Sequence, residues 1–324
     1  MLRASILSVP MVVALYYPAC TPKMQPTMPA SAAPLNELWQ EPANIGSRDV
    51  FDGPWGAEHA PDPNVTYAFV SRKQQGTNPG VTVTDPDGKE WHVKQPTHTD
   101  QGAEGPIEVT LSRVLSAVGY HQPPVYFVPA LKIADRRGVH VEPGGRFRLT
   151  EKSMKHVGEW SWQQNPFVGQ RPYQGLLVIL LMFNSSDLKN SNNTLYQVTR
   201  GGRTAEWYVV RDLGDALGKT GRFAPQRNNL EIFARTRFIT GVSGGFAEFG
   251  DYRGLHGELL HGRITPADVA WASALIGGLS ERQWQDAFRA GGYPPHVARQ
   301  FISILRGRVA EGQRIGTTGV AASR

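Results

Sequence analysis

The 324-residue sequence has a single cysteine, Cys20. One cysteine excludes an internal disulfide framework and any zinc or iron–sulfur site built from several cysteines. A strong excess of either charge is also missing, because 34 Lys and Arg stand against 28 Asp and Glu. This modest positive balance allows anionic partners such as nucleotides, phospholipids or acidic glycans, but it gives no reason to expect a nucleic acid as partner.

Long hydrophobic runs are missing from most of the chain. After Tyr16 the longest run is Leu176–Phe183, whose eight residues fit a buried helix and are too few to span a bilayer. The 35 glycines and 24 prolines make up about a fifth of the chain, less than in low-complexity sequences. Hydrophobic residues, at 40%, suffice for a sizeable core, which a chain of this length usually divides between two domains or lobes.

The first twenty residues have the pattern of a secretion signal. Arg3 precedes an uncharged, mostly apolar stretch over 4–16, the length of a signal-peptide core. Cys20 follows, and this end resembles a bacterial lipobox, with Tyr17 in place of the usual aliphatic residue. We expect residues 1–20 to be a signal peptide and Cys20 to carry a lipid anchor at the cell envelope, on the periplasmic or extracellular side. The alternative is a misplaced start codon with a chance cysteine, which would leave the protein in the cytoplasm.

Beyond the leader, the pattern predicts a tether and two halves of an α+β protein. Residues 21–45 hold five prolines and little apolar periodicity, which predicts a flexible tether. Residues 46–152 are predicted to form short strands and one helix, which has Pro106 in its first turn and ends before Gly119. Residues 153–324 are predicted to be mostly helical, with a central buried helix and two short strands.

Five strands are predicted in the first half, at residues 67–73, 81–84, 90–95, 125–128 and 146–150. A turn through Pro143-Gly144-Gly145 is expected to join the last two. In the second half, strands are predicted at 195–198 and 207–210. Helices are predicted to begin at Thr265-Pro266 and at Ser280, which has Gln283 at the spacing of a capping box.

Asp187, Lys189 and Asn192 follow the predicted central helix. Phosphoryl transfer needs a carboxylate to orient a hydroxyl, a cation to neutralise charge on the moving group, and an oxygen ligand for Mg²⁺. These three side chains supply all of them within one loop. Taken alone, the pattern is also typical of turns and helix caps. Asn193 is an alternative to Asn192, which only its spacing favours.

Two further groups carry chemistry. Asp212-Leu213-Gly214 follows a predicted strand, where the carboxylate can reach a metal while the backbone turns away, although a plain strand-to-loop turn has the same pattern. Lys94 lies in a predicted strand, and Glu108 lies beside the apolar stripe of the next helix, where a carboxylate needs a partner. An ion pair of the two would hold the ammonium toward nucleotide phosphates. Otherwise Lys94 faces solvent and Glu108 is a favourable charge near a helix N-terminus.

The chain order of glycine-bearing hairpin, strand Lys, helix Glu, Asp-x-Lys-x-x-Asn and Asp-Leu-Gly resembles the protein-kinase-like superfamily from about Tyr67 to Gly218. The resemblance implies a two-lobed fold, with a small antiparallel-sheet N-lobe carrying one helix over 46–152 and a larger helical C-lobe over 153–324. Between them the lobes would hold Mg²⁺ (or Mn²⁺) and ATP or another nucleotide. The resemblance also implies a phosphate-covering loop at Gly76 and Gly80, and a phosphate-binding Lys94 paired with Glu108. It implies that Asp187 is the catalytic base beside Lys189, and that Asn192 and Asp212 are metal ligands.

Parts of the family pattern are missing. The G-x-G-x-x-G motif is incomplete, Ser185-Ser186 replaces His-Arg, Leu213 replaces Phe, and no A-P-E segment follows. The chain is therefore similar to atypical members, such as secretory-pathway, spore-coat or phosphoinositide kinases. We expect a Mg²⁺-dependent phosphotransferase acting on a hydroxyl of a protein, lipid or glycan. The alternatives are a non-catalytic, pseudokinase-like binding module at the cell envelope, where ATP is scarce, and transfer of a nucleotidyl group.

A basic segment follows Asp212. It contains Arg222, Arg227, Arg235 and Arg237. Basic residues in such a segment usually form a solvated surface. We therefore expect these arginines to face solvent, in preference to forming a site for a phosphate-bearing substrate.

Overall fold

The structure is a computed structural model that describes residues 34–74, 78–97, 103–219 and 226–321. The predicted signal peptide, the Cys20 anchor, residues 21–33 of the tether and Gly76 lie outside these ranges. The described residues belong to one compact unit, and all elements below lie within it. In the described ranges, no helix combines the length and the apolar character that crossing a bilayer requires.

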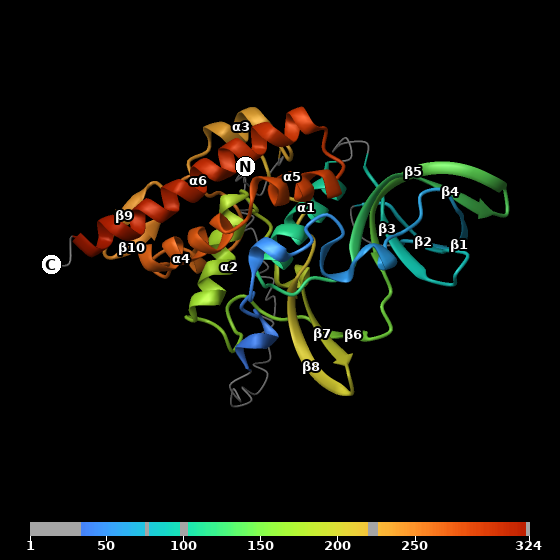
Figure 1. Ribbon diagram of the computed structural model, residues 1–324, viewed down its shortest axis with the longest axis horizontal. Helices are drawn as coiled ribbons and strands as arrows, with labels where there is room; N and C mark the ends of the chain where they lie inside the picture. The colour runs from blue at the N-terminus through green and yellow to red at the C-terminus, as the bar shows by residue number, and fades with distance from the viewer. Residues whose placement is uncertain (1–33, 75–77, 98–102, 220–225, 322–324) are drawn as a thin grey trace, which may run out of the picture. The chain divides into compact units, whose positions relative to one another are not determined.

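Five strands of the first half close into a barrel in the order β1-β2-β3-β5-β4 (Figure 1). Their bounds are Thr66–Arg72 (β1), Gly80–Thr84 (β2), Glu90–Lys94 (β3), Val125–Asp135 (β4) and Gly138–Leu149 (β5). Neighbouring strands are antiparallel except β1 and β4, which run parallel and close the barrel. The predicted antiparallel sheet is corrected to this closed form, because alternate side chains such as Val83, Trp91 and Phe147 fill a common interior.

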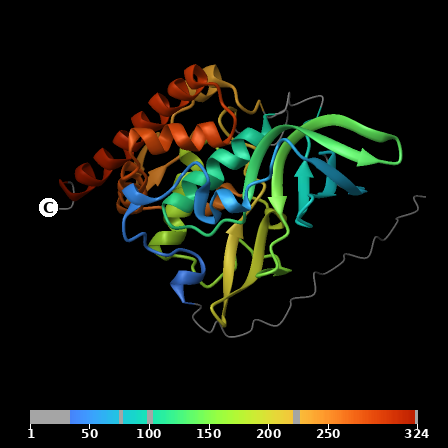
Figure 2. The same ribbon diagram turned by 45° about the vertical axis from the view of Figure 1, so that its right-hand side comes forward.

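The hairpin of β4 and β5 differs from the prediction. Both strands run further than expected and turn at residues 136–137, so the hairpin projects from the barrel at the end away from the helices (Figures 1 and 2). Gly144 and Gly145 lie inside β5 and not in a turn. A Cβ on Gly144 would collide with the carbonyl oxygen of Val128, and one on Gly145 with that of Lys94. These glycines therefore allow close approach of neighbouring strands, and the predicted turn is wrong.

Helix α1 (Glu104–Ala117) has Pro106 in its first turn and ends before Gly119, as predicted. Its apolar stripe, which includes Ile107, Leu111 and Val114, is fully buried. The stripe does not join the core of the barrel. It belongs to the larger core formed by the helices of the second half. The one helix of the first half therefore links the barrel to the helical part.

The second half is mostly helical, as predicted. Its helices are α2 (Arg171–Met182), α3 (Leu230–Arg235), α4 (Pro266–Gly277), α5 (Glu281–Ala290) and α6 (Pro295–Ala321). Helix α2 is apolar on nearly all sides and lies buried in the large core. Capping boxes at Thr265 with Asp268 and at Ser280 with Gln283 begin α4 and α5, which confirms both predicted starts.

A three-stranded sheet, β6-β7-β8, precedes most of these helices (Figure 2). Its strands are Met154–Gly158 (β6), Asn193–Arg200 (β7) and Arg203–Val210 (β8), and a small hairpin follows at Gly241–Ser243 (β9) and Phe246–Glu248 (β10). The two predicted strands are thus confirmed and extended, whereas β6, β9 and β10 were not predicted. Asn193 pairs with Val210, so the residues just outside the sheet, Asn192 and Arg211, lie side by side.

The described part of the predicted tether is packed. Leu38 is 1% exposed, and the indole Nε1 of Trp39 donates to the carbonyl oxygen of Val118 at 2.8 Å. For residues 34–45 the prediction of a flexible tether is therefore wrong, because two large apolar side chains anchor the segment beside α1. The described ranges also contain short 3₁₀ helices at Leu35–Glu37, Ile45–Ser47, Gly53–Trp55, Ala57–His59, Asn190–Asn192 and Gly257–Leu259.

Candidate functional site

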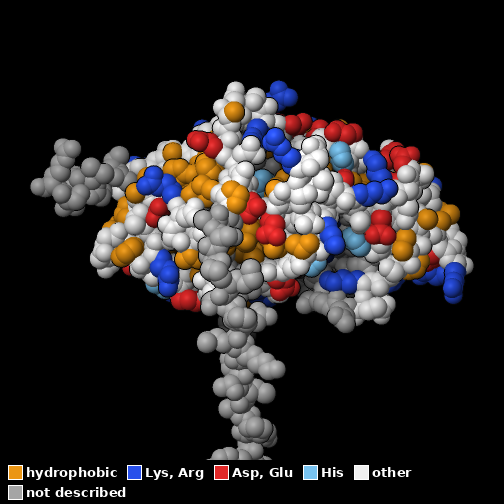
Figure 3. Space-filling view, turned by 90° about the horizontal axis from the view of Figure 1, so that it is seen from below, with side chains coloured by type: hydrophobic (Ala, Val, Ile, Leu, Met, Phe, Trp, Pro, Cys, Tyr) orange, Lys and Arg blue, Asp and Glu red, His pale blue; other side chains and the backbone are white. Residues whose placement is uncertain are grey.

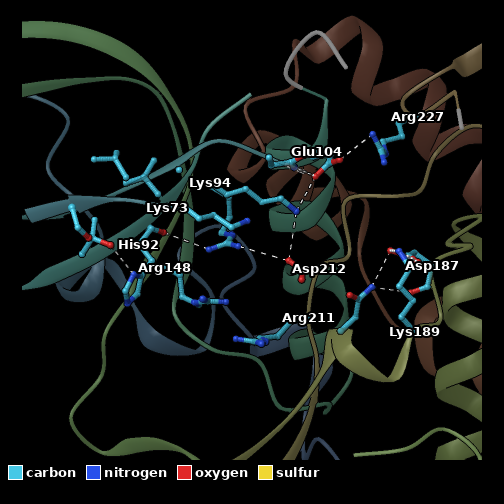
Figure 4. A pocket seen from close by; sticks show the side chains of 18 residues that line it. Lys73, His92, Lys94, Glu104, Arg148, Asp187, Lys189, Arg211, Asp212 and Arg227 are labelled. Atoms are coloured by element: carbon cyan, nitrogen blue, oxygen red, sulfur yellow. Dashed lines mark hydrogen bonds and ion pairs between the residues drawn. The ribbon is translucent and has the colours of Figure 1, made fainter. Parts of the chain in front are cut away.

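A polar cavity of about 550 Å³ lies between the outer face of the barrel and the loops that follow α2 and β8 (Figure 4). Six of the eight site residues predicted from the sequence line it: Gly80, Lys94, Asp187, Lys189, Asn192 and Asp212. Glu108 lies behind this lining, in contact with Lys94. Gly76 falls outside the described residues.

The strand register explains why Lys94 points into the cavity. Lys94 pairs with Gly80 on one side and with Arg146 on the other. The alternate residues Val93 and Phe147 point into the barrel, so Lys94 and Arg146 point outward together. A Cβ on Gly80 would lie 2.8 Å from the carbonyl oxygen of Val93, so glycine lets β2 lie close to β3 beside the lysine.

The ammonium of Lys94 is shared by three carboxylates. Its Nζ lies 2.8 Å from Glu104, 3.5 Å from Asp212 and 3.6 Å from Glu108. Burial would lower the pKa of Lys94, but Glu108, Asp212 and Glu104 together raise it, so the lysine stays charged. The predicted partner Glu108 is in ion-pairing range. The nearest partner is Glu104, which the sequence analysis did not identify.

Glu108 holds a second cation. Its Oε1 lies 2.8 Å from Nε of Arg146, and both side chains are 5% exposed. A carboxylate this deeply buried needs such partners, because an unpaired charge inside a protein is costly. Glu108 therefore fixes the outward pair of Lys94 and Arg146 from behind. It does not itself face the cavity.

Asp212 is the second residue after β8. Its backbone is left-handed, with φ of 51°. This turn directs its carboxylate back to the barrel, where Oδ1 lies 3.5 Å from Lys94 and 3.9 Å from Arg146. Burial would raise the pKa of Asp212, but Lys94, Arg146 and Arg211 lower it overall. The carboxylate is therefore ionised at neutral pH, and 40% of the side chain is exposed toward the cavity.

The loop after α2 brings Asp187, Lys189 and Asn192 together. Nζ of Lys189 lies 2.9 Å from Asp187 Oδ1, and the amide of Asn192 donates to both Asp187 Oδ2 and the Asp187 carbonyl oxygen at 3.0 Å. These bonds use the amide nitrogen of Asn192 and leave its carbonyl oxygen for another ligand. The alternative residue, Asn193, is fully buried, and its amide donates to the carbonyl oxygen of Trp160.

The oxygen atoms that line the cavity can be compared with the ligands that a metal ion requires. Among the described residues, no group of three or more His, Cys, Asp and Glu side chains is arranged to hold one. Glu104, Asp187 and Asp212 supply carboxylates to the cavity, but Glu104 and Asp187 are paired with Lys94 and Lys189. The predicted ligands Asp212 and Asn192 add one carboxylate and one amide oxygen. Mg²⁺ commonly takes one or two carboxylates and completes its octahedron with water and substrate phosphates. These residues therefore fit a Mg²⁺ that arrives with a polyphosphate, and they do not fit a metal held by protein alone.

The sequence analysis did not predict that several Lys and Arg side chains line the cavity. Arg227 lies 2.9 Å from Glu104 and 3.4 Å from Asp215, which corrects the prediction of a solvated surface at this position. Arg235 and Arg237 do lie at the surface, paired with Glu231 and Asp251, and Arg222 lies outside the described ranges. Arg146, Arg148, Arg211 and Lys73 complete the basic lining.

A sequence signal existed for two of these cations. In Arg146-Phe147-Arg148 the charges alternate with a buried aromatic residue, as on a strand with one polar face. Two arginines on the same face of a barrel give that face positive charge. Figure 3 shows Lys, Arg and His side chains interspersed with Asp and Glu on the barrel end of the face seen from below.

Comparison with known proteins gives one distant similarity. No family model matches the sequence, and no curated protein matches it. The crystal structure of a Helicobacter pylori proinflammatory kinase, CtkA, is similar over 81% of this chain and 100% of that chain, with 11% sequence identity and a TM-score of 0.43. A similarity at this level assigns neither a family nor an activity to the chain.

Proposed function

We propose that the protein is a Mg²⁺-dependent phosphotransferase of atypical kinase type, which binds ATP or another nucleotide in the cavity and transfers a phosphoryl group to a hydroxyl. The support is the convergence of Lys94, Asp187, Asn192 and Asp212 on one cavity. Lys94 and Asp212 are 118 positions apart in the chain, and yet they form an ion pair. Chance placement of turn-forming residues does not account for this convergence.

Each of these side chains has a part in the proposed reaction. Lys94 contacts the nucleotide phosphates, with Glu104 and Glu108 holding its ammonium in place. Asp212 and the amide oxygen of Asn192 hold Mg²⁺, which when bound neutralises charge on the phosphates. Without nucleotide, Lys94 and Asp212 neutralise each other.

Asp187 faces the acceptor. Its carboxylate orients the hydroxyl and takes its proton as the new bond to phosphorus forms. Asn192 holds this carboxylate by two hydrogen bonds. Lys189, which is 54% exposed, can move from Asp187 to the transferred group and offset its charge.

The acceptor and the compartment belong to the same proposal. If Cys20 is lipidated, the acceptor is a protein, lipid or glycan at the cell envelope. An unprocessed chain would act in the cytoplasm, where ATP is abundant. Intact-mass analysis of the membrane fraction distinguishes the two, because acylation and loss of residues 1–19 change the mass.

The proposal is tested by nucleotide binding and by release or transfer of the labelled γ-phosphate of ATP. Asp212→Ala should abolish Mg²⁺-dependent nucleotide binding. Asp187→Asn should keep binding but slow turnover by a factor on the order of 10²–10⁴. Asp87→Asn, at an exposed turn outside the cavity, is the matched control and should behave as wild type.

Two results would count against the enzyme. If both cavity variants turn over like the Asp87 control, the assigned site is wrong. If the wild type binds Mg²⁺·ATP but neither hydrolyses nor transfers it, the protein is a non-catalytic binding module. Label from the α-phosphate in the product would instead indicate nucleotidyl transfer.

A further inference from the structure

The cations of the cavity divide into two groups. Seven Lys and Arg side chains line it. Four of them form ion pairs with carboxylates: Lys94, Arg146, Lys189 and Arg227. For the other three, Lys73, Arg148 and Arg211, the described part of the chain supplies no carboxylate within ion-pairing distance. The cavity therefore carries positive charge that the protein does not offset.

Arg148 is the most unusual of the three. It lies on β5, two residues beyond Arg146, and is paired with His92 of the neighbouring strand β3. Within the described ranges its partly buried guanidinium has neither a hydrogen bond nor an ion pair. Burial, Arg146 and Arg211 lower the pKa of Arg148 to about 10. It is nonetheless charged at neutral pH, so its position costs stability unless an anion binds.

Arg211 approaches the same space from the other side. It follows β8, and Figure 4 shows it near Arg148 in the lower part of the cavity. Its Nη1 donates to the hydroxyl of Tyr196 at 3.3 Å, but its buried Nε has no hydrogen-bond partner among the described residues. Two guanidinium groups thus face one region of the cavity with unused N–H donors.

Arg148 and Arg211 form no ion pair with the carboxylates that hold Lys94, although both act on the charge of Asp212. Two residues along a strand span about 7 Å, so Arg148 lies about 7 Å from Arg146 along β5. The nearby His92 adds no positive charge at neutral pH, because burial, Arg148 and Arg146 lower its pKa. The anion that fits here must therefore be bound by the two arginines, with the exposed Lys73 at the rim.

We propose that Arg148 and Arg211 form a second anion subsite, which binds a phosphate group carried by the acceptor. This inference rests on the proposed phosphotransferase function. A phosphate monoester has a charge of roughly −1.5 to −2 at neutral pH and three acceptor oxygens, which suits two arginines better than a single carboxylate does. The acceptor is thus a phosphorylated compound with a free hydroxyl.

The proposed reaction transfers the γ-phosphoryl group of the nucleotide to the hydroxyl of this acceptor. The hydroxyl proton passes to Asp187, the hydroxyl oxygen bonds to the γ-phosphorus, and the bond from that phosphorus to the β-phosphate oxygen breaks. The nucleoside diphosphate leaves. The phosphate held by Arg148 and Arg211 is not consumed, and serves only to position the acceptor.

The subsite is tested with inorganic phosphate as probe, by calorimetry and thermal unfolding of the full chain. Arg148→Gln and Arg211→Gln should each weaken phosphate binding by at least about tenfold. Each variant should also melt at a higher temperature than wild type when phosphate is absent, because an unpaired cation is removed. Arg203→Gln, at the exposed far end of β8, controls for general salt effects of phosphate and should match wild type.

A nucleotide arm separates this inference from the proposed function. Lys94→Met should lose Mg²⁺·ATP binding but keep phosphate binding, and wild type should bind phosphate with nucleotide already present. Phosphate affinity unchanged in both arginine variants would overturn the second subsite and leave the nucleotide site standing. If phosphate competes with ATP, and Arg148→Gln weakens the binding of phosphate and of ATP together, these arginines bind the nucleotide and not the acceptor.

Discussion

At Glu104 a single buried carboxylate serves two cations from different parts of the chain. Oε2 lies 2.8 Å from Lys94 Nζ, Oε1 lies 2.9 Å from Arg227 Nη1, and the amide of Asn78 donates to the same carboxylate. The side chain of Glu104 is 11% exposed, so these contacts are only weakly screened by solvent. Glu104 therefore fixes the ammonium that the proposed function uses.

Glu104→Gln keeps the shape of the side chain and removes its charge. We expect the free energy of unfolding to fall by about 2–4 kcal/mol, because Lys94 and Arg227 each lose a buried partner. Urea unfolding measures this change. Glu41→Gln, at an exposed position outside the cavity, should change stability by less than about 0.5 kcal/mol. An equally small change for Glu104→Gln would contradict the assigned network.

The sequence predicts the residues of the cavity better than their partners. Asp187, Lys189, Asn192 and Asp212 lie in short local patterns whose chemistry is visible in the letters alone. Glu104 and Glu108 lie one helical turn apart on α1, so the choice between them as partner for Lys94 depends on how α1 packs against the barrel. Arg227 depends on the position of a loop, which has no sequence periodicity.

At the scale of elements, β5 requires glycine where it crosses the end of the barrel. A Cβ at Gly144 would meet the carbonyl oxygen of Val128 and the backbone of Pro129 and Ala130 on β4. Backbone atoms cannot move aside as a flexible side chain can. The β4–β5 register that places Arg146 and Arg148 in the cavity therefore depends on this glycine.

Gly144→Ala should lower the free energy of unfolding by at least about 1–3 kcal/mol, the cost of forcing atoms into a packed site. The measurement is chemical denaturation, followed by tryptophan fluorescence because Trp91 is buried in the barrel. Gly158→Ala on β6 is the matched control, since its Cβ would meet no atom within 4 Å. Equal stability of the two variants would show that β5 tolerates a side chain at this position.

The sequence predicts elements that depend on a local pattern, and it does not predict those that depend on pairing between distant residues. The starts of α4 and α5 are confirmed, because a capping box is complete within four residues. Barrel closure depends on the parallel pairing of Tyr67 with Ile133, which no local pattern contains. Pro143-Gly144-Gly145 is typical of a turn, but here the same residues serve strand contact.

At the scale of the whole molecule, the cavity joins the barrel to the helical part. Its lining comes from β1, β2, β3 and β5 on one side, from the start of α1, and from the loops after α2 and β8 on the other side. A ligand bound to both sides stabilises the folded protein as a unit. By mass action, a nucleotide at a hundred times its dissociation constant adds about 2.7 kcal/mol to the free energy of unfolding.

The most direct test of the central claim is calorimetric titration of the full chain with ATP, with and without Mg²⁺. We expect wild type to bind ATP only in the presence of Mg²⁺, and Lys94→Met to lose this binding. Lys132→Met, which removes an exposed lysine on β4, should bind like wild type. Binding of equal affinity in the Lys94 and Lys132 variants, or no binding of any nucleotide by wild type, would contradict a nucleotide site in this cavity.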